Sequence, residues 1–167
     1  MANKSELKKL KKLELQEKAA DLGIETKGLK KDELIEAILK AGKANKKMEA
    51  HGIECAIKFI TQRFGWVVLE KNWSCYAGDV DIIAYDVDDE VIHFIDVKTR
   101  LSNGTGYPSE AAVSAATRIR WETCAELYLS DYDGTEAGIT FDCIRINVLN
   151  NGRAMLRVYR NMLSQGC

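Results

Sequence analysis

The sequence predicts a mixed α/β (α+β) fold, in which a central mixed sheet is flanked by helices and preceded by a small helical module. Three observations support this prediction. After residue 50, helical patterns alternate with short runs rich in β-branched and aromatic residues, in the order αβββαββ. Two of these runs carry acidic residues inside otherwise apolar strands. The first 48 residues are rich in lysine and contain helix-forming patterns but no strand-like run.

Residues 1–42 are expected to form a helix, a short extended link and a second helix. The two helices are predicted at residues 5–22 and 31–40, because apolar residues recur at helical spacing in both. Gly23 suits the end of the first helix, since glycine readily adopts the left-handed conformation common just after a helix. A polar, Lys-rich linker is predicted at residues 43–49.

The main domain is predicted to occupy residues 50–167. In chain order, we expect a helix that ends at Gly65, a strand, a hairpin of two strands, a long helix and a second pair of strands. The expected ranges are 50–64, 66–70, 79–85, 90–99, 109–129, 139–148 and 154–159. Both strand pairs are joined by turn-forming residues, Asp86-Val87-Asp88-Asp89 and Asn150-Asn151-Gly152.

Charge is unevenly distributed along the chain. Residues 1–48 hold 13 lysines, no arginine and 8 acidic residues, a net charge of +5, whereas the whole chain has −1. A basic appendage on an acidic body is expected where a polyanion-binding module adjoins a metal-binding domain. A Lys-rich helix face that serves only solubility explains the same charge equally well.

The cysteines and the N-terminus bear on the cellular compartment. Five scattered cysteines form no CxxC pair and no zinc-site spacing, which is typical of reduced thiols in the cytosol. The N-terminus lacks the apolar segment of a secretory signal, and no apolar run approaches the length of a membrane span. We therefore expect a cytoplasmic protein without a membrane partner.

The two acidic strands carry the candidate catalytic residues. Asp96 and Lys98 are two positions apart in a strand, so their side chains point to the same face. Asp81 joins them if the two strands pair as a hairpin. Two carboxylates beside a lysine are the groups with which a site binds a hard divalent cation and hydrolyses a phosphodiester. The alternative is a structural ion pair between Lys98 and one of the two aspartates.

These residues resemble a known pattern. The order acid, turn, Asp-x-Lys is similar to the PD-(D/E)xK motif of restriction-endonuclease-like nucleases, and a longer set resembles the YraN-like family of predicted endonucleases. The stretches that carry the longer resemblance are Glu54, Gly65-Trp66-Val67-Val68-Leu69, Asn72-Trp73, Gly78-Asp79-Val80-Asp81-Ile82-Ile83-Ala84 and Ile95-Asp96-Val97-Lys98-Thr99-Arg100.

The resemblance implies a restriction-endonuclease-like core and a catalytic set of Asp81, Asp96, Lys98 and Glu54. Mg²⁺ or Mn²⁺ is the implied metal, held by the three acidic residues of this set. The chain departs from the family pattern at four positions. Asp79 and Asp96 stand where glutamate is usual, Ile53 where glycine is usual, and Thr117 where a basic residue is common.

The N-terminal residues resemble the SAP-like and Rho-termination-factor N-terminal modules, most of which bind nucleic acid. The expected partner is therefore nucleic acid, with DNA preferred and RNA left open. The expected contacts are Lys30 and Lys31 in the module and Arg100 and Arg118 in the main domain. Three alternatives stay open: the module docks a protein, the chain forms a homodimer, or it is a non-catalytic nucleic-acid-binding or scaffolding protein that retains the nuclease fold.

Overall fold

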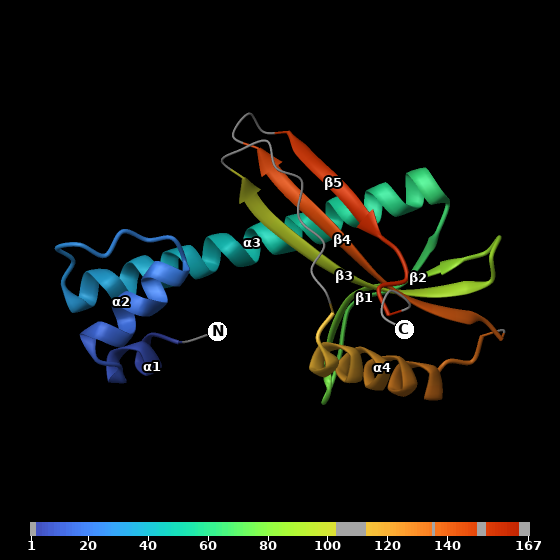
Figure 1. The fold of residues 1–167 in the computed structure, drawn as a ribbon, viewed down its shortest axis with the longest axis horizontal. Coiled ribbons are helices and arrows are strands. Elements are labelled where there is room, and N and C mark those ends of the chain that lie inside the picture. Colours follow the sequence, from blue (N-terminus) through green and yellow to red (C-terminus); the bar gives the residue numbers. More distant parts are fainter. Residues whose placement is uncertain (1–2, 103–112, 135, 150–152, 164–167) are drawn as a thin grey trace. The chain divides into compact units, whose positions relative to one another are not determined.

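The computed structural model of the protein describes residues 3–102, 113–134, 136–149 and 153–163 (Figure 1). The chain divides into two compact units, Met1–Met48 and Glu49–Cys167. None of the helices in the described ranges combines the length and the apolar character that a membrane span requires.

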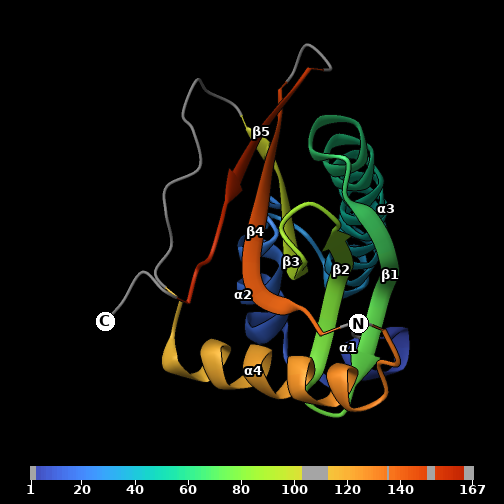
Figure 2. The same ribbon diagram turned by 90° about the vertical axis from the view of Figure 1, so that its right-hand side faces the viewer.

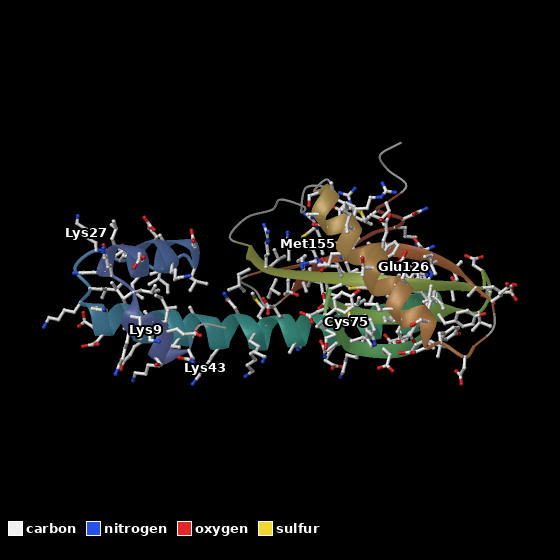
Figure 3. The ribbon with its side chains drawn as sticks, turned by 90° about the horizontal axis from the view of Figure 1, so that it is seen from below. Lys9, Lys27, Lys43, Cys75, Glu126 and Met155 are labelled. Atoms are coloured by element: carbon white, nitrogen blue, oxygen red, sulfur yellow. The ribbon has the colours of Figure 1, made fainter. Side chains whose placement is uncertain are left out.

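The N-terminal unit consists of α1 (Lys4–Lys9), α2 (Lys12–Asp21) and the first part of α3 (Lys31–Phe64). The side chain of Asn3 caps α1 by accepting hydrogen bonds from two main-chain amides of its first turn. The core of this unit is entirely aliphatic and consists of Leu7, Leu15, Ala19, Leu34, Ile35 and Ile38. The lysines lie outside this core: Lys9, Lys27 and Lys43 are all exposed and come from different segments of the unit (Figure 3).

Two helix boundaries in this region differ from the sequence prediction. The helix expected over residues 5–22 is interrupted at Leu10 and Lys11, whose backbones are extended. The main-chain N of Lys11 donates to Glu14 Oε2 at 2.6 Å, so the side chain of Glu14 starts a new helix at this point.

Residues 43–49, predicted as a polar linker, are helical and belong to α3, and the boundary between the two units falls within them. The segment contains no proline, and its lysines, alanines and Met48 are good helix formers. Buried residues anchor the helix on both sides of this segment, Ile38 in the core of the first unit and Ile53 in that of the second. A polar stretch between two anchored helical segments continues the helix at little cost.

The second unit is built on a five-stranded sheet in the order β1-β2-β3-β4-β5 (Figure 1). The strands are β1 (Val67–Cys75), β2 (Gly78–Asp86), β3 (Val91–Ser102), β4 (Gly138–Leu149) and β5 (Ala154–Tyr159). Neighbouring strands are antiparallel except β3 and β4, which are parallel. The chain between these two contains α4 (Ala115–Ser130), the kind of crossover that parallel strands need. The predicted order αβββαββ is confirmed.

Helices cover opposite faces of the sheet (Figure 2). We call these the α3 face and the α4 face. On the α3 face, Ile53, Ala56 and Ile60 of the helix pack against alternate residues of the strands, including Ile82, Ala84, Ile95, Val97, Ile144 and Ile146. On the α4 face, Trp121, Cys124 and Ala125 pack against the intervening residues, including Ile83, Phe94 and Phe141. The period-2 alternation of β3 and β4 therefore separates two cores, whereas in β2 the alternation is broken between Val80, in the core of the α4 face, and Ile82, in that of the α3 face.

The other element boundaries agree with the sequence prediction in most places. Gly65 follows the end of α3 with φ 74°, the left-handed conformation that favours glycine. β1 is longer than expected and continues to Cys75. α4 begins at Ala115, with the side chain of Ser114 as its cap. The predicted helix start at Ser109 and the predicted turn at residues 150–152 lie outside the described residues.

Candidate active site

The β2–β3 hairpin opens at the candidate catalytic residues. Backbone pairing between the two strands runs from Asp86 opposite Val91 to Ile82 opposite Ile95. Asp81 comes directly after the last pair, and its Oδ2 accepts a hydrogen bond from the main-chain N of Val97 at 2.6 Å. A carboxylate thus takes the place of a backbone carbonyl where the strands diverge, and this single bond sets the position of the Asp81 side chain.

Asp96 and Lys98 form a close pair on the α4 face of β3. Lys98 Nζ donates to Asp96 Oδ1 at 2.8 Å, as the two-residue spacing predicts. The Asp96 side chain is 17% exposed and that of Lys98 is 56% exposed. The carboxylate is therefore largely enclosed, whereas the ammonium group reaches solvent.

The charges of Asp81, Asp96 and Lys98 act on one another. Burial is the main cause that raises the pKa of Asp81, and the nearby charge of Asp96 adds to it, against the opposing effects of the Val97 hydrogen bond and of Lys98. Burial acts to lower the pKa of Lys98, but the hydrogen bond to Asp96 and the charges of both aspartates outweigh it, so that pKa is raised. The structure therefore brings these three predicted residues together as one coupled group.

Glu54, the fourth predicted catalytic residue, is held in a different interaction. Its Oε1 forms an ion pair with Lys71 Nζ of β1 at 2.7 Å, and both side chains are largely exposed. The acid of α3 whose charge raises the pKa of Asp81 is Glu49. A helix has about 3.6 residues per turn, so positions five apart point in different directions, and the side of α3 that carries Glu49 differs from the side that carries Glu54.

The donor chemistry fits a hard divalent cation. Within the ranges that the structure describes, no three His, Cys, Asp or Glu side chains are grouped closely enough to hold a metal by themselves. Mg²⁺ usually binds proteins through only one or two carboxylates and keeps several waters, and Mn²⁺ also prefers oxygen ligands. Asp81 and Asp96 supply two such carboxylates, and the mutual repulsion that contributes to the raised pKa of Asp81 is the kind that a bound cation relieves.

The four predicted nucleic-acid contacts lie in different settings. Arg100 is exposed on β3, two positions beyond Lys98 and on the same face. Arg118 pairs with Glu122 along α4, with Nε 3.0 Å from Oε1. Lys31 Nζ donates to the main-chain O of Lys8 at 2.9 Å and so joins α3 to α1. Lys30 is exposed. Only Arg100 adjoins the coupled group.

Strand β4 brings two residues to the site that the sequence reasoning missed. In the parallel register, Cys143 lies opposite Asp96 and Arg145 opposite Lys98. Cys143 Sγ is 4.0 Å from Asp96 Oδ2, and its pKa is raised by burial first and by the charge of Asp96 second. The sequence did show Arg145 as a lone arginine between Ile144 and Ile146 in an apolar strand. The register of that strand with β3, which brings Arg145 to Lys98, could not be predicted from the sequence.

The arrangement of a helix, a three-stranded meander, a crossover helix and two further strands defines a restriction-endonuclease-like core, with Asp81, Asp96 and Lys98 on its second and third strands. The chain belongs to the uncharacterised protein family UPF0102, also called YraN-like, whose family model matches residues 53–148. Residues 6–46 match the Rho termination factor N-terminal domain, in agreement with the predicted N-terminal module.

Curated relatives carry the same family name. The chain is 38% identical over 105 residues to a UPF0102 protein of Clostridium perfringens strain 13, covering 63% of this chain and 83% of the relative. It is 37% identical over 97 residues to one of Nocardia farcinica, covering 58% and 73%. It is 35% identical over 111 residues to one of Dictyoglomus thermophilum, covering 66% and 91%. The similarity covers most of each relative.

Proposed function

We propose that this protein is a metal-dependent endonuclease that hydrolyses phosphodiester bonds of nucleic acid, with DNA as the preferred substrate. The observation that carries the proposal is the opened hairpin, which holds the Asp81 carboxylate beside the Asp96–Lys98 pair. An ion pair between Asp81 and Lys98 would be the structural alternative. Asp81 instead accepts from a main-chain amide and carries a raised pKa, so its negative charge is costly until a cation joins it.

Each residue has a distinct role in the proposed reaction. Asp81 and Asp96 would hold Mg²⁺ or Mn²⁺, which when bound polarises a phosphate and lowers the pKa of a coordinated water. The Val97 amide orients Asp81, and the hydrogen bond from Lys98 orients Asp96. Lys98, whose ammonium group reaches solvent, stabilises the additional negative charge that develops on the phosphate as water attacks.

The N-terminal unit supports a nucleic-acid substrate. Its net charge of +5 suits a polyanion, and its sequence matches the Rho termination factor N-terminal domain. We infer that this unit contributes sequence-independent affinity, while the second unit carries the chemistry.

A cleavage screen on the full-length protein tests the proposal. Labelled DNA and RNA are supplied as duplexes, single strands, flaps and junctions, with Mg²⁺, Mn²⁺ or EDTA. We expect cleavage that needs the metal and is lost in Asp96→Asn. Asp89→Asn is the matched control, because Asp89 is an exposed carboxylate in the turn at the other end of the same hairpin. If the wild-type protein cleaves none of these substrates, the proposed nuclease activity is refuted.

A non-catalytic nucleic-acid-binding protein that retains the fold is the second candidate. The pairing of Glu54 with Lys71 favours it, because a helix acid engaged in a surface ion pair is not poised to complete a metal site. The two candidates differ in the cleavage screen, whereas both predict binding without metal.

A further inference from the structure

Three neighbouring strands place cations in one row on the α4 face. Lys98 of β3 lies opposite Arg145 of β4, and Arg145 lies opposite Arg157 of β5. The packing of their neighbours sets the direction of the two arginines. Ile144 and Ile146 flank Arg145, and Leu156 and Val158 flank Arg157, and all four pack in the core of the α3 face. Both arginines therefore point to the α4 face, as Lys98 does.

The row places three positively charged side chains side by side across three strands. Neighbouring strands are about 4.8 Å apart, so the three cations span roughly 10 Å. Arg100, two residues along β3 from Lys98, adds a fourth positive charge to the same face. A row of positive side chains of this length suits an anion of similar length.

The ring of Tyr159 contacts the guanidinium groups of both arginines. Tyr159 is 5% exposed and lies opposite Cys143 in the register of β4 and β5. The guanidinium carbon of Arg145 is 5.5 Å from the ring centroid and that of Arg157 is 5.1 Å from it. Cation–π contacts with the ring hold the two guanidinium groups in place. Arginines that served only solubility would not need a buried aromatic support.

We propose that Lys98, Arg145 and Arg157 form a phosphate-binding row that receives the backbone of the nucleic-acid strand next to the scissile phosphodiester. This inference rests on the proposed function and assigns the path of the substrate. The row begins at the Asp96–Lys98 pair, crosses β4 and ends at the edge strand β5. α4 packs mainly on β2 and β1, toward the other edge of the sheet. Guanidinium groups bind phosphate in a bidentate manner, and such contacts position a backbone without reading its sequence.

Binding without metal tests the row separately from catalysis. Full-length wild type, Arg157→Gln and the Arg145→Gln, Arg157→Gln double variant are titrated against a labelled DNA duplex and a labelled single strand in EDTA at several salt concentrations. Each lost phosphate contact should flatten the slope of log K against log salt by about 0.9 on duplex and about 0.7 on single strands. The double variant should bind at least about tenfold more weakly near physiological salt, equally for unrelated sequences.

Arg63→Gln is the matched control, because Arg63 is an exposed arginine in the last turn of α3. Circular dichroism verifies folding, and Arg157→Glu keeps the test valid if the half-buried Arg145 does not tolerate glutamine. If the row variants bind with the same affinity and salt slope as the Arg63→Gln control, the proposed phosphate-binding row is refuted. Reduced binding by the row variants in a protein that cleaves nothing would keep the row and refute the nuclease, so the two failures are distinguishable.

Discussion

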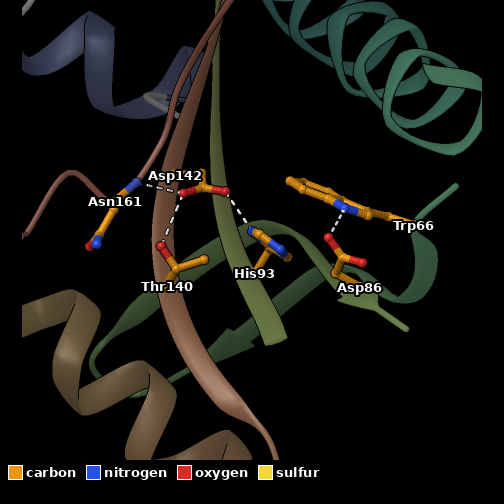
Figure 4. A network of polar contacts seen from close by, with 6 residues as sticks. All are labelled: Trp66, Asp86, His93, Thr140, Asp142 and Asn161. Atoms are coloured by element: carbon orange, nitrogen blue, oxygen red, sulfur yellow. Dashed lines mark hydrogen bonds and ion pairs between the residues drawn. The ribbon is translucent and has the colours of Figure 1, made fainter. Parts of the chain in front are cut away.

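A buried polar network ties the strands of the α3 face together at the level of single residues (Figure 4). His93 Nδ1 lies 2.7 Å from Asp142 Oδ2, and Asp142 Oδ1 accepts from the main-chain N of Asn161 at 2.8 Å. Trp66 stacks on His93 with ring centroids 3.6 Å apart and donates its Nε1–H to Asp86 at 2.6 Å. Every side chain drawn here from β2, β3 and β4 thus has a polar partner, although the buried Nε2 of His93 has none among the described residues.

Asp142→Ala should lower the free energy of unfolding by about 2–6 kcal/mol, because it leaves the His93 ring and the Asn161 amide without an acceptor and each buried unsatisfied group costs about 1–3 kcal/mol. Urea denaturation measures the change. Asp89→Ala, which removes an exposed carboxylate, should stay within about 0.5 kcal/mol of wild type. A loss in Asp142→Ala no larger than in this control would show that the network contributes nothing.

Asp96 and Lys98 should act as one catalytic unit, since each orients or balances the other. Asp96→Asn and Lys98→Ala should each reduce the cleavage rate by about two orders of magnitude or more, the loss seen when one preorganised electrostatic group is removed. The double variant should be hardly slower than either single variant. Multiplicative losses, measured as single-turnover rates, would mean that the two residues act independently.

At the scale of the element, α3 lies close to β3 at Gly52. A Cβ built at this position would overlap Thr99 Oγ1, so only glycine lets the helix lie this close to the strand. Thr99 follows Lys98, and Glu49, whose charge acts on Asp81, is three residues before Gly52. The distance between α3 and β3 therefore also sets the surroundings of the candidate site.

Gly52→Ala should destabilise the protein by about 1–3 kcal/mol, the usual cost of overpacking. Gly42→Ala is the matched control in the same helix, because a Cβ there meets nothing within 4 Å. It should stabilise the protein by about 0.5–1 kcal/mol, since alanine is the better helix former. Thermal or urea denaturation compares the two. A gain in stability at both positions would mean that α3 does not pack closely on β3.

At the scale of the whole molecule, metal binding is linked to stability. Burial first, and the like charge of Asp96 second, disfavour the charged form of Asp81 in the folded state until a cation balances it. A cation at a hundredfold excess over its Kd should add about 2.7 kcal/mol to stability. The Tm of wild type should therefore rise with Mg²⁺ or Mn²⁺, and that of Asp96→Asn should rise much less. Equal increases in the two proteins would place the cation elsewhere.

The N-terminal unit should supply part of the affinity for nucleic acid through its charge of +5. Removing residues 1–45 should weaken binding and flatten the dependence of log K on log salt, because each lost phosphate contact on duplex DNA removes about 0.9 from the slope. Titration of both proteins against the same duplex measures this change. Identical affinity and slope in the shortened protein would indicate that the unit binds a different partner, such as a protein.

Local sequence periodicity was enough to predict the order of helices and strands and the grouping of three candidate site residues. The period of two in a strand places Asp96 and Lys98 on one face, and the polar turn after Asp86 predicts the hairpin that brings Asp81 to them. The glycine at position 65 ends the helix for a reason local to its own backbone. The order of helices and strands follows from the same short-range patterns, so fold class and the three coupled residues could be inferred without coordinates.

Only the tertiary structure decided which distant residues join that group. Arg145 and Arg157 reach Lys98 through the registers of β3 with β4 and of β4 with β5, and the first of these depends on a long crossover. Glu49 rather than Glu54 acts on Asp81 because packing sets the rotation of α3. Helical continuity through residues 43–49 likewise depends on anchors in two cores. These features arise from long-range packing, which short-range patterns do not encode.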